Sequence, residues 1–255
     1  EEYVRVASES GIERITFTCH IPMRFSGFGG SGIRMDTEQL PEYREKIKKA
    51  REFGKPLGVD VLYGIEAEYF PDASAMAAME EVLKSEPFDY VLGSLHAALP
   101  GYRDWLRSRD KNTNEQIVES YFEHLKEAVA SRRYDSLAHP DVIRLYEVLP
   151  CPFKPEAHEP VIRSFLETAK EYDQCLEVNT SGRIKGDYVL HPDPIILKWA
   201  AEIGNRFTIG SDSHKPESVG QEFYYALPLL QELGIHELYC FENRKALPVP
   251  IWQAE

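Results

Sequence analysis

Residues 59–68 read VDVLYGIEAE, and the interpretation of the whole chain starts from this stretch. Its run of apolar residues is typical of a buried strand, and the acidic Glu66 stands near its end. Similar strand-like segments lie at 13–18, 88–96, 136–140, 174–180, 206–212 and 236–241. Segments with helical spacing of apolar residues separate them, at 1–11, 37–53, 74–84, 115–131, 155–172, 192–204 and 217–234. Strands that alternate with helices pair in parallel through right-handed crossovers, so the pattern predicts an α/β barrel.

Two segments are expected to lack regular structure. Residues 97–114 form the longest irregular stretch, and the Pro-containing residues after 241 form a short tail. The chain has no repeat, linker or low-complexity block that would divide it. We therefore expect residues 1–255 to form a single barrel domain.

Residues that commonly bind metals stand at the predicted ends of the strands. They are His20, Glu66, His96, His139, Asp212 and His214. In a barrel of β/α units the carboxyl ends of the strands converge on one mouth, which would make these distant residues neighbours. His, Glu and Asp together suit borderline divalent metals, so the pattern predicts a metalloenzyme. For GSDSH at 210–214 alone, an alternative is that Asp212 caps the next helix and His214 bonds a backbone carbonyl.

Composition excludes several classes of protein. The formal net charge of −13 argues against a nucleic-acid surface, since phosphate backbones require clustered Lys and Arg. No apolar run approaches the roughly 18 residues of a membrane span, and no signal peptide is recognisable. The four cysteines are dispersed without a CxxC pair, which favours reduced thiols in the cytoplasm. The oligomeric state stays open.

Seven ordered motifs together identify a family more specifically than any one of them. They are FTCHIPM (17–23), RMDTEQLPEY (34–43), GIEAEYFP (64–71), PFDYVLGSLH (87–96), AHPD (138–141), EVNTSG (177–182) and GSDSH with KPESVG (210–220). On these motifs the chain resembles the histidinol-phosphatase branch of the PHP (polymerase and histidinol phosphatase) phosphoesterases. The resemblance implies a distorted (β/α)7-type TIM-like barrel that hydrolyses L-histidinol phosphate to L-histidinol and phosphate in histidine biosynthesis. It also implies two to three divalent ions, zinc, manganese or iron, as cofactors.

The resemblance further implies individual roles for the metal-binding candidates. Glu66, His96 and His139 bind one ion, and Glu66 bridges to a second. Asp212 binds that second ion, whereas His20 and His214 serve a third. Divalent ions suit the hydrolysis of a phosphate ester because they offset its negative charge and activate water. Asp212 or His214 is also expected to handle a proton, and the sequence does not separate this role from metal binding.

Three arginines are candidates for contacting the small phosphorylated substrate. The guanidinium group suits bidentate phosphate binding. The family places basic residues in the loops that carry Arg144 and Arg183, and Arg34, at the start of RMDTEQLPEY, could line the pocket. For Arg144 and Arg183 a solvated surface arginine is the alternative.

One family motif is absent from this chain. The family opens with an HxH pair on a first strand, followed by another His, and this chain starts after that motif. We therefore expect the first strand to be missing, with truncation of this sequence as the simpler interpretation. A natural protein that lacks the pair, and that is weak or inactive, is the alternative.

Two rival functions remain open on the sequence. One is a PHP phosphoesterase that acts on another small phosphate or on a nucleotide. The other is a non-catalytic metal-binding barrel that has lost its first motif.

Overall fold

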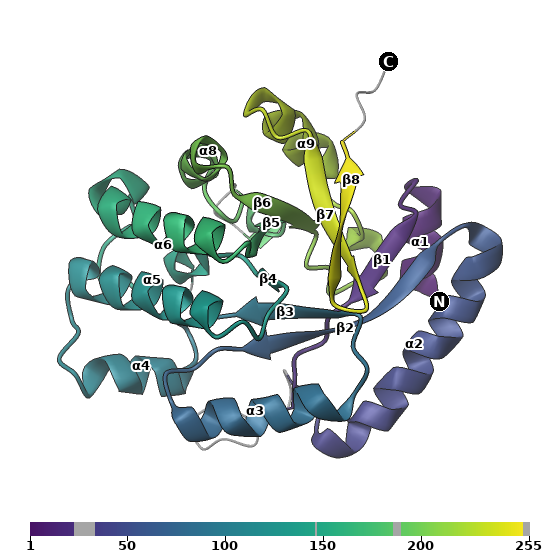
Figure 1. The fold of residues 1–255 in the computed structure, drawn as a ribbon, viewed down its shortest axis with the longest axis horizontal. Coiled ribbons are helices and arrows are strands. Elements are labelled where there is room, and N and C mark those ends of the chain that lie inside the picture. The colour runs from purple at the N-terminus through teal and green to yellow at the C-terminus, as the bar shows by residue number, and fades with distance from the viewer. Residues whose placement is uncertain (23–33, 146, 186–189, 252–255) are drawn as a thin grey trace.

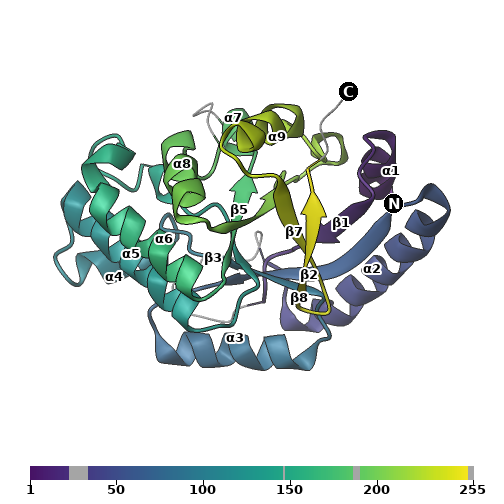
Figure 2. The same ribbon diagram turned by 45° about the horizontal axis from the view of Figure 1, so that its top comes forward.

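A curved parallel sheet forms the centre of the molecule. The computed structural model describes residues 1–22, 34–145, 147–185 and 190–251. Six strands lie side by side in chain order, and each neighbouring pair is parallel. They are β1 (Arg14–Phe17), β2 (Asp60–Glu68), β3 (Tyr90–Ser94), β4 (Ser136–Leu137), β5 (Cys175–Asn179) and β6 (Arg206–Gly210). The sheet curls like half a barrel with helices along its outside (Figures 1 and 2), which confirms the predicted α/β class.

Helices connect the strands. They are α1 (Glu2–Glu9), α2 (Leu40–Gly54), α3 (Ala73–Ser85), α4 (Pro100–Arg107), α5 (Asn114–Ala130), α6 (Glu159–Glu171), the short α7 (Gly182–Lys185), α8 (Pro194–Ile203) and α9 (Phe223–Glu232). The expectation of irregular structure at 97–114 is wrong for α4, which begins at Pro100, a residue well suited to the first turn of a helix. No helix in the described ranges is long and apolar enough to cross a membrane.

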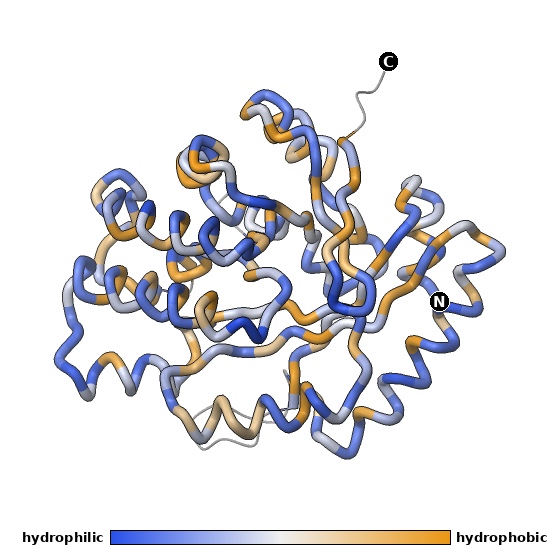
Figure 3. Tube along the Cα trace, in the orientation of Figure 1, coloured by the Kyte–Doolittle hydropathy of each residue, from blue (hydrophilic) through white to orange (hydrophobic). Residues whose placement is uncertain are grey.

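Periodicity explains which faces become buried. The buried residues of α2 are Leu40, Tyr43, Ile47, Ala50 and Gly54, which recur every three or four positions and so form one face. Hydrophilic and hydrophobic residues accordingly alternate along the helices in Figure 3. In β2, Val61, Ile65 and Ala67 are fully buried in the main core cluster. Because side chains alternate along a strand, Glu66 and Glu68 share the opposite face of β2, toward the inside of the barrel.

The last two strands form a hairpin of their own. β7 (Glu237–Glu242) pairs antiparallel with β8 (Lys245–Pro250). The prediction of a strand at 236–241 is confirmed, but the prediction that it pairs in parallel is wrong. The residues after 241, which were expected to form an irregular tail, contain the strand β8 instead. The connecting residues, Asn243 and Arg244, have φ values of 50° and 64°. Positive φ at both central residues is the geometry of a two-residue turn that matches the twist of a hairpin.

The hairpin lies across the amino ends of the sheet strands. The backbone N–H of Arg244 donates to the Asp89 carbonyl at 2.8 Å, and its side chain bonds Asp135 at 2.5 Å. Asp89 and Asp135 directly precede β3 and β4. On the inner face of the sheet, the Phe241 ring stacks on Tyr90 with ring centres 5.0 Å apart. The hairpin therefore covers the end of the barrel opposite the carboxyl ends that carry the candidate ligands.

Candidate metal centre

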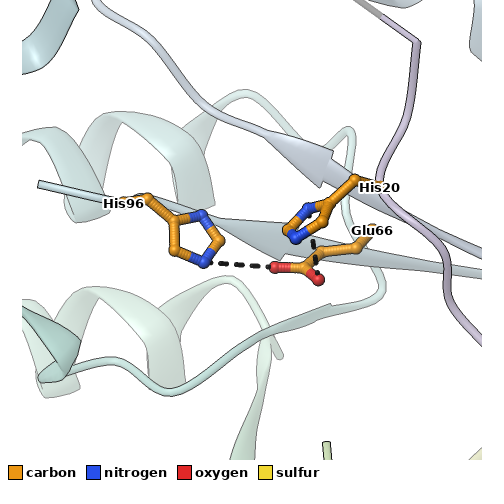
Figure 4. Close-up of side chains that lie close together, drawn as sticks. All are labelled: His20, Glu66 and His96. Atoms are coloured by element: carbon orange, nitrogen blue, oxygen red, sulfur yellow. Dashed lines mark ion pairs between the residues drawn. The ribbon is translucent and has the colours of Figure 1, made fainter. Parts of the chain in front are cut away.

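Three histidines converge on the carboxylate of Glu66. The Nε2 atoms of His96 and His139 each lie 3.6 Å from Glu66 Oε1, and His20 Nδ1 lies 3.5 Å from Glu66 Oε2. Figure 4 shows His20 and His96 pointing toward opposite oxygens of the carboxylate. One ligand atom from each of His20, Glu66 and His96 falls within 4.8 Å of the others, as a shared metal ion requires. The structure thus brings together four of the six residues that the sequence singled out.

Backbone pairing places His20 beside Glu66. Beyond the end of β1 the chain still runs parallel to β2, so that His20 and Glu66 form an isolated bridge. The Glu66 N–H donates to the Cys19 carbonyl at 3.0 Å, and the Ile21 N–H donates to the Glu66 carbonyl at 2.8 Å. Sheet hydrogen bonds thus hold the two side chains together.

His139 lies on a strained turn after β4. Its φ is 27°, in the left-handed region that non-glycine residues seldom adopt and that is enriched at functional sites. The His139 N–H donates to Glu177 Oε2 at 3.1 Å, and Asn179 Nδ2 donates to the same oxygen at 3.0 Å. Glu177 is itself fitted against Gly210, where an added Cβ atom would collide with Glu177 Oε1. Glycine at 210 is therefore required for the carboxylate that supports His139.

Electrostatics keep Glu66 ionised. Burial by itself would raise the pKa of Glu66, but His20, His139 and His96 together hold this pKa well below its usual range. Burial disfavours the charged form of an imidazole and so lowers the pKa of His20. Burial acts in the same direction on His139, but the interaction with Glu66 outweighs it and raises the pKa of His139 to about 9. For Glu177 burial dominates and raises the pKa to about 7. The centre thus contains a carboxylate anion faced by imidazoles on both sides.

The residues at this centre fit a divalent cation. Glu66 Oε1 is buried and has no hydrogen-bond partner among the described residues, although two imidazole nitrogens face it. Leaving a buried carboxylate oxygen unsatisfied is costly, and a cation between the oxygen and the imidazoles would remove that cost. Imidazole and carboxylate are the donors that zinc and similar metals take in proteins.

Of the two remaining candidates, Asp212 interacts electrostatically with His139, whereas the His214 side chain is largely exposed. Asp212 has a φ of 48°, and its Oδ2 accepts from Lys185 Nζ at 2.6 Å and from Ser181 Oγ at 3.0 Å. Although burial would raise the pKa of Asp212, the Lys185 ammonium lowers it, and Asp212 in turn contributes to the raised pKa of His139. The His214 side chain is 72% exposed, and its Nδ1 lies 2.9 Å from the Asp212 carbonyl oxygen. His214 therefore has the backbone contact that the alternative interpretation of GSDSH describes.

The three candidate arginines occupy different environments. Arg34 is buried against Glu68, with Nη2 3.2 Å from Glu68 Oε2. Arg144 is 9% exposed and contacts Asp141 at 3.2 Å and Asp193 at 3.6 Å. Arg183 is 28% exposed, pairs with Glu222 at 2.6 Å and lies over the Tyr225 ring. Of these three side chains, that of Arg183 is the most accessible to a substrate.

Sequence reasoning missed three supporting residues. Glu68 and Glu177 hold His96 and His139, and Lys185 binds Asp212. Glu68 was detectable, because it stands two residues after Glu66 and side chains two apart share a face of a strand. Lys185 had no comparable signal, since its contact joins segments that lie 27 residues apart.

Comparisons with known proteins identify the family and the fold. Residues 1–181 match the PHP domain family. A probable histidinol-phosphatase of Deinococcus radiodurans is 30% identical, covering 97% of this chain and 92% of that protein. A probable phosphatase of Caldanaerobacter subterraneus is also 30% identical, covering 92% of this chain and 77% of that protein. The crystal structure of the Lactococcus lactis histidinol phosphate phosphatase with zinc, L-histidinol and phosphate has a similar fold, with a TM-score of 0.78 and 23% identity over 96% of this chain and 91% of that one.

Proposed function

This chain belongs to the PHP domain family, in the histidinol-phosphatase branch, and we propose that it hydrolyses L-histidinol phosphate to L-histidinol and inorganic phosphate in a metal-dependent reaction. The observation that carries this proposal is the convergence of His20, His96 and His139 on the buried carboxylate of Glu66. The names of the relatives and the zinc, L-histidinol and phosphate bound by the Lactococcus protein support the substrate.

We propose two to three divalent ions, zinc, manganese or iron, as cofactors. Because the two oxygens of Glu66 face different imidazoles, Glu66 can bridge two ions. His96 and His139 would hold one ion together with Glu66. Asp212, whose negative charge helps to raise the pKa of His139, would hold the second ion, to which Glu66 bridges, whereas His20 and His214 would serve a third.

The chemistry divides between the cofactor and the chain. When bound, the ions supply positive charge against the phosphate and lower the pKa of a water that attacks phosphorus. Asp212 or His214 would take or give the proton, and the Oδ2 of Asp212 accepts hydrogen bonds from Lys185 and Ser181 that would hold its carboxylate in place. Arg183 would contact the phosphate oxygens from the rim, after exchanging its contact with Glu222.

The proposal includes a single PHP-type barrel domain over residues 1–255. One hydrophobic core cluster contains residues from Val4 in α1 to Leu238 in β7, which supports a single domain. A cytoplasmic location and the absence of a nucleic-acid partner stay predictions from composition.

A second candidate is a phosphatase for another small phosphate, which the relative named only as a probable phosphatase favours. Metal analysis should be combined with phosphate-release assays on histidinol phosphate, other phosphomonoesters and a dinucleotide. We expect bound divalent metal and the highest kcat/KM for histidinol phosphate. A higher kcat/KM for another ester would overturn the substrate assignment, whereas metal binding without hydrolysis of any ester would identify a non-catalytic barrel.

A further inference from the structure

We propose that Glu68 and Arg34 form a positioning pair for His96. Glu68 orients the imidazole so that its Nε2 faces the metal position, and Arg34 anchors and neutralises Glu68. This inference rests on the proposed function, because it takes His96 as a metal ligand. It assigns Arg34 a role that differs from the substrate contact expected from the sequence.

Glu68 holds His96 at two points. Glu68 Oε1 accepts the backbone N–H of His96 at 2.6 Å, and Oε2 accepts from His96 Nδ1 at 2.7 Å. A proton on Nδ1 leaves Nε2 with a free electron pair, and Nε2 is the atom that faces Glu66 at 3.6 Å. Metal-binding histidines commonly donate their other ring nitrogen to a carboxylate in this way, which fixes the tautomer and the ring orientation.

Strand register brings Glu68 to His96. In the pairing of β2 with β3, Glu66 lies opposite Leu92 and Glu68 lies opposite Ser94, two residues before His96. Because Glu66 and Glu68 share one face of β2, a single strand supplies both the proposed ligand and the carboxylate that orients a second ligand. The contact between Glu68 and His96 therefore depends on the same backbone hydrogen bonds between strands as the metal centre does.

Arg34 supplies the countercharge that a buried carboxylate needs. Glu68 is 1% exposed, and an ionised carboxylate at such a position is costly without a cation. The Arg34 side chain is 8% exposed and contacts Glu68 Oε2 at 3.2 Å, the same oxygen that accepts from His96. Arg34 Nη2 therefore already has a carboxylate partner inside the protein.

The test is a double-mutant cycle on zinc affinity. Zn²⁺ is titrated into the metal-free protein against a chromophoric chelator, using Glu68→Gln, Arg34→Met and the double variant. Gln keeps an oxygen for the His96 N–H, but the NH2 group that would then face Nδ1 can only donate and cannot accept from it. We expect Glu68→Gln to weaken zinc binding about 10- to 100-fold and Arg34→Met to weaken it less. The double variant should bind no more weakly than Glu68→Gln, because Arg34 acts through Glu68.

Two controls accompany the cycle. Glu80→Gln removes the carboxylate partner of Arg133, 2.9 Å away on the outside of the barrel, and should leave zinc affinity unchanged. Arg34→Lys keeps the charge and should restore most of the affinity lost in Arg34→Met, which preserves the test if Glu68→Gln does not fold.

Nitrogen-15 spectra of the metal-free protein should show the Nδ1–H tautomer of His96 in the wild type and a mixture of tautomers in Glu68→Gln.

The outcomes separate this inference from the proposed function. Wild-type zinc affinity in both Glu68→Gln and Arg34→Met would overturn the positioning pair while leaving the metal centre intact. If Arg34→Met raised KM for phosphate esters equally with and without the Glu68→Gln substitution, and zinc affinity were unchanged, Arg34 would be a substrate contact instead. A wild-type protein that binds no divalent metal would overturn the proposed function itself.

Discussion

Glu66 is the residue on which the other side chains of the centre depend. It is the shared neighbour of His20, His96 and His139, and one of its oxygens is buried without a hydrogen-bond partner among the residues described. Removing its charge should therefore disturb the whole centre, whereas removal of a single imidazole would disturb one side.

The Glu66→Gln variant should lose both metal and turnover. The neutral amide removes the anionic ligand that Glu66 would offer to the ions, so we expect loss of the bound metal and a fall in kcat/KM of at least about 100-fold. Elemental analysis and a phosphate-release assay measure the two effects. Glu167→Gln, at an exposed position on α6, is the matched control. Full activity of Glu66→Gln in the presence of chelator would remove Glu66 from the centre.

Arg183 and Arg144 should respond differently to truncation. Arg183→Ala removes a partly exposed guanidinium, and we expect KM for histidinol phosphate to rise about 10-fold with the metal content unchanged. Arg144→Ala breaks buried contacts with Asp141 and Asp193, so its main effect should be a lower free energy of unfolding. Steady-state kinetics and urea denaturation of both variants test this contrast. Unaltered kinetics of Arg183→Ala would remove it from the substrate site.

At the scale of elements, the two ends of the barrel have different roles. The carboxyl ends of the strands supply the metal centre, and the β7–β8 hairpin covers the amino ends through Arg244 and Phe241. We therefore expect that a substitution in the hairpin can lower the stability without weakening metal binding.

Phe241→Ala should destabilise the protein without weakening the metal site. Phe241 is 6% exposed and stacks on Tyr90, so its truncation should lower the free energy of unfolding by about 3 kcal/mol. Val249→Ala in β8, at a position 43% exposed, is the control and should cost far less. Urea denaturation and zinc titration measure both properties. A loss of zinc affinity in Phe241→Ala, with the fold retained, would contradict the separation of the two ends.

At the scale of the whole molecule, metal binding should stabilise the fold. The centre joins the segment after β1 to β2, β3 and β4, so a bound ion would tie together residues from His20 to His139. At a free zinc concentration of about 100 times Kd, linkage predicts roughly 2.7 kcal/mol of stabilisation.

Thermal unfolding with and without chelator tests this coupling. We expect the Tm to fall when metal is removed and to return when zinc is added back. Glu66→Gln should show little response to either treatment, which provides the control. An identical Tm for metal-free and zinc-loaded wild type would mean that zinc does not bind preferentially to the folded state.

The amino-acid sequence by itself determined the alternation of strands and helices and the residue types at the strand ends. These features follow from periodicity along a short stretch, as in VDVLYGIEAE, where each residue's face depends on its immediate neighbours. The α/β class and the convergence of His20, Glu66, His96 and His139 could therefore be predicted before any coordinates were known.

Only the tertiary structure decided which side chains share one carboxylate and which residues support them. The hydrogen bond from His96 to Glu68 depends on the register between β2 and β3. The salt bridge from Lys185 to Asp212 depends on how the end of α7 meets the segment after β6. The hairpin likewise became visible only in space, because a lone strand-like segment does not specify its partner. Periodicity acts over a few residues, whereas register, curvature and loop contacts are set by packing across the whole sheet.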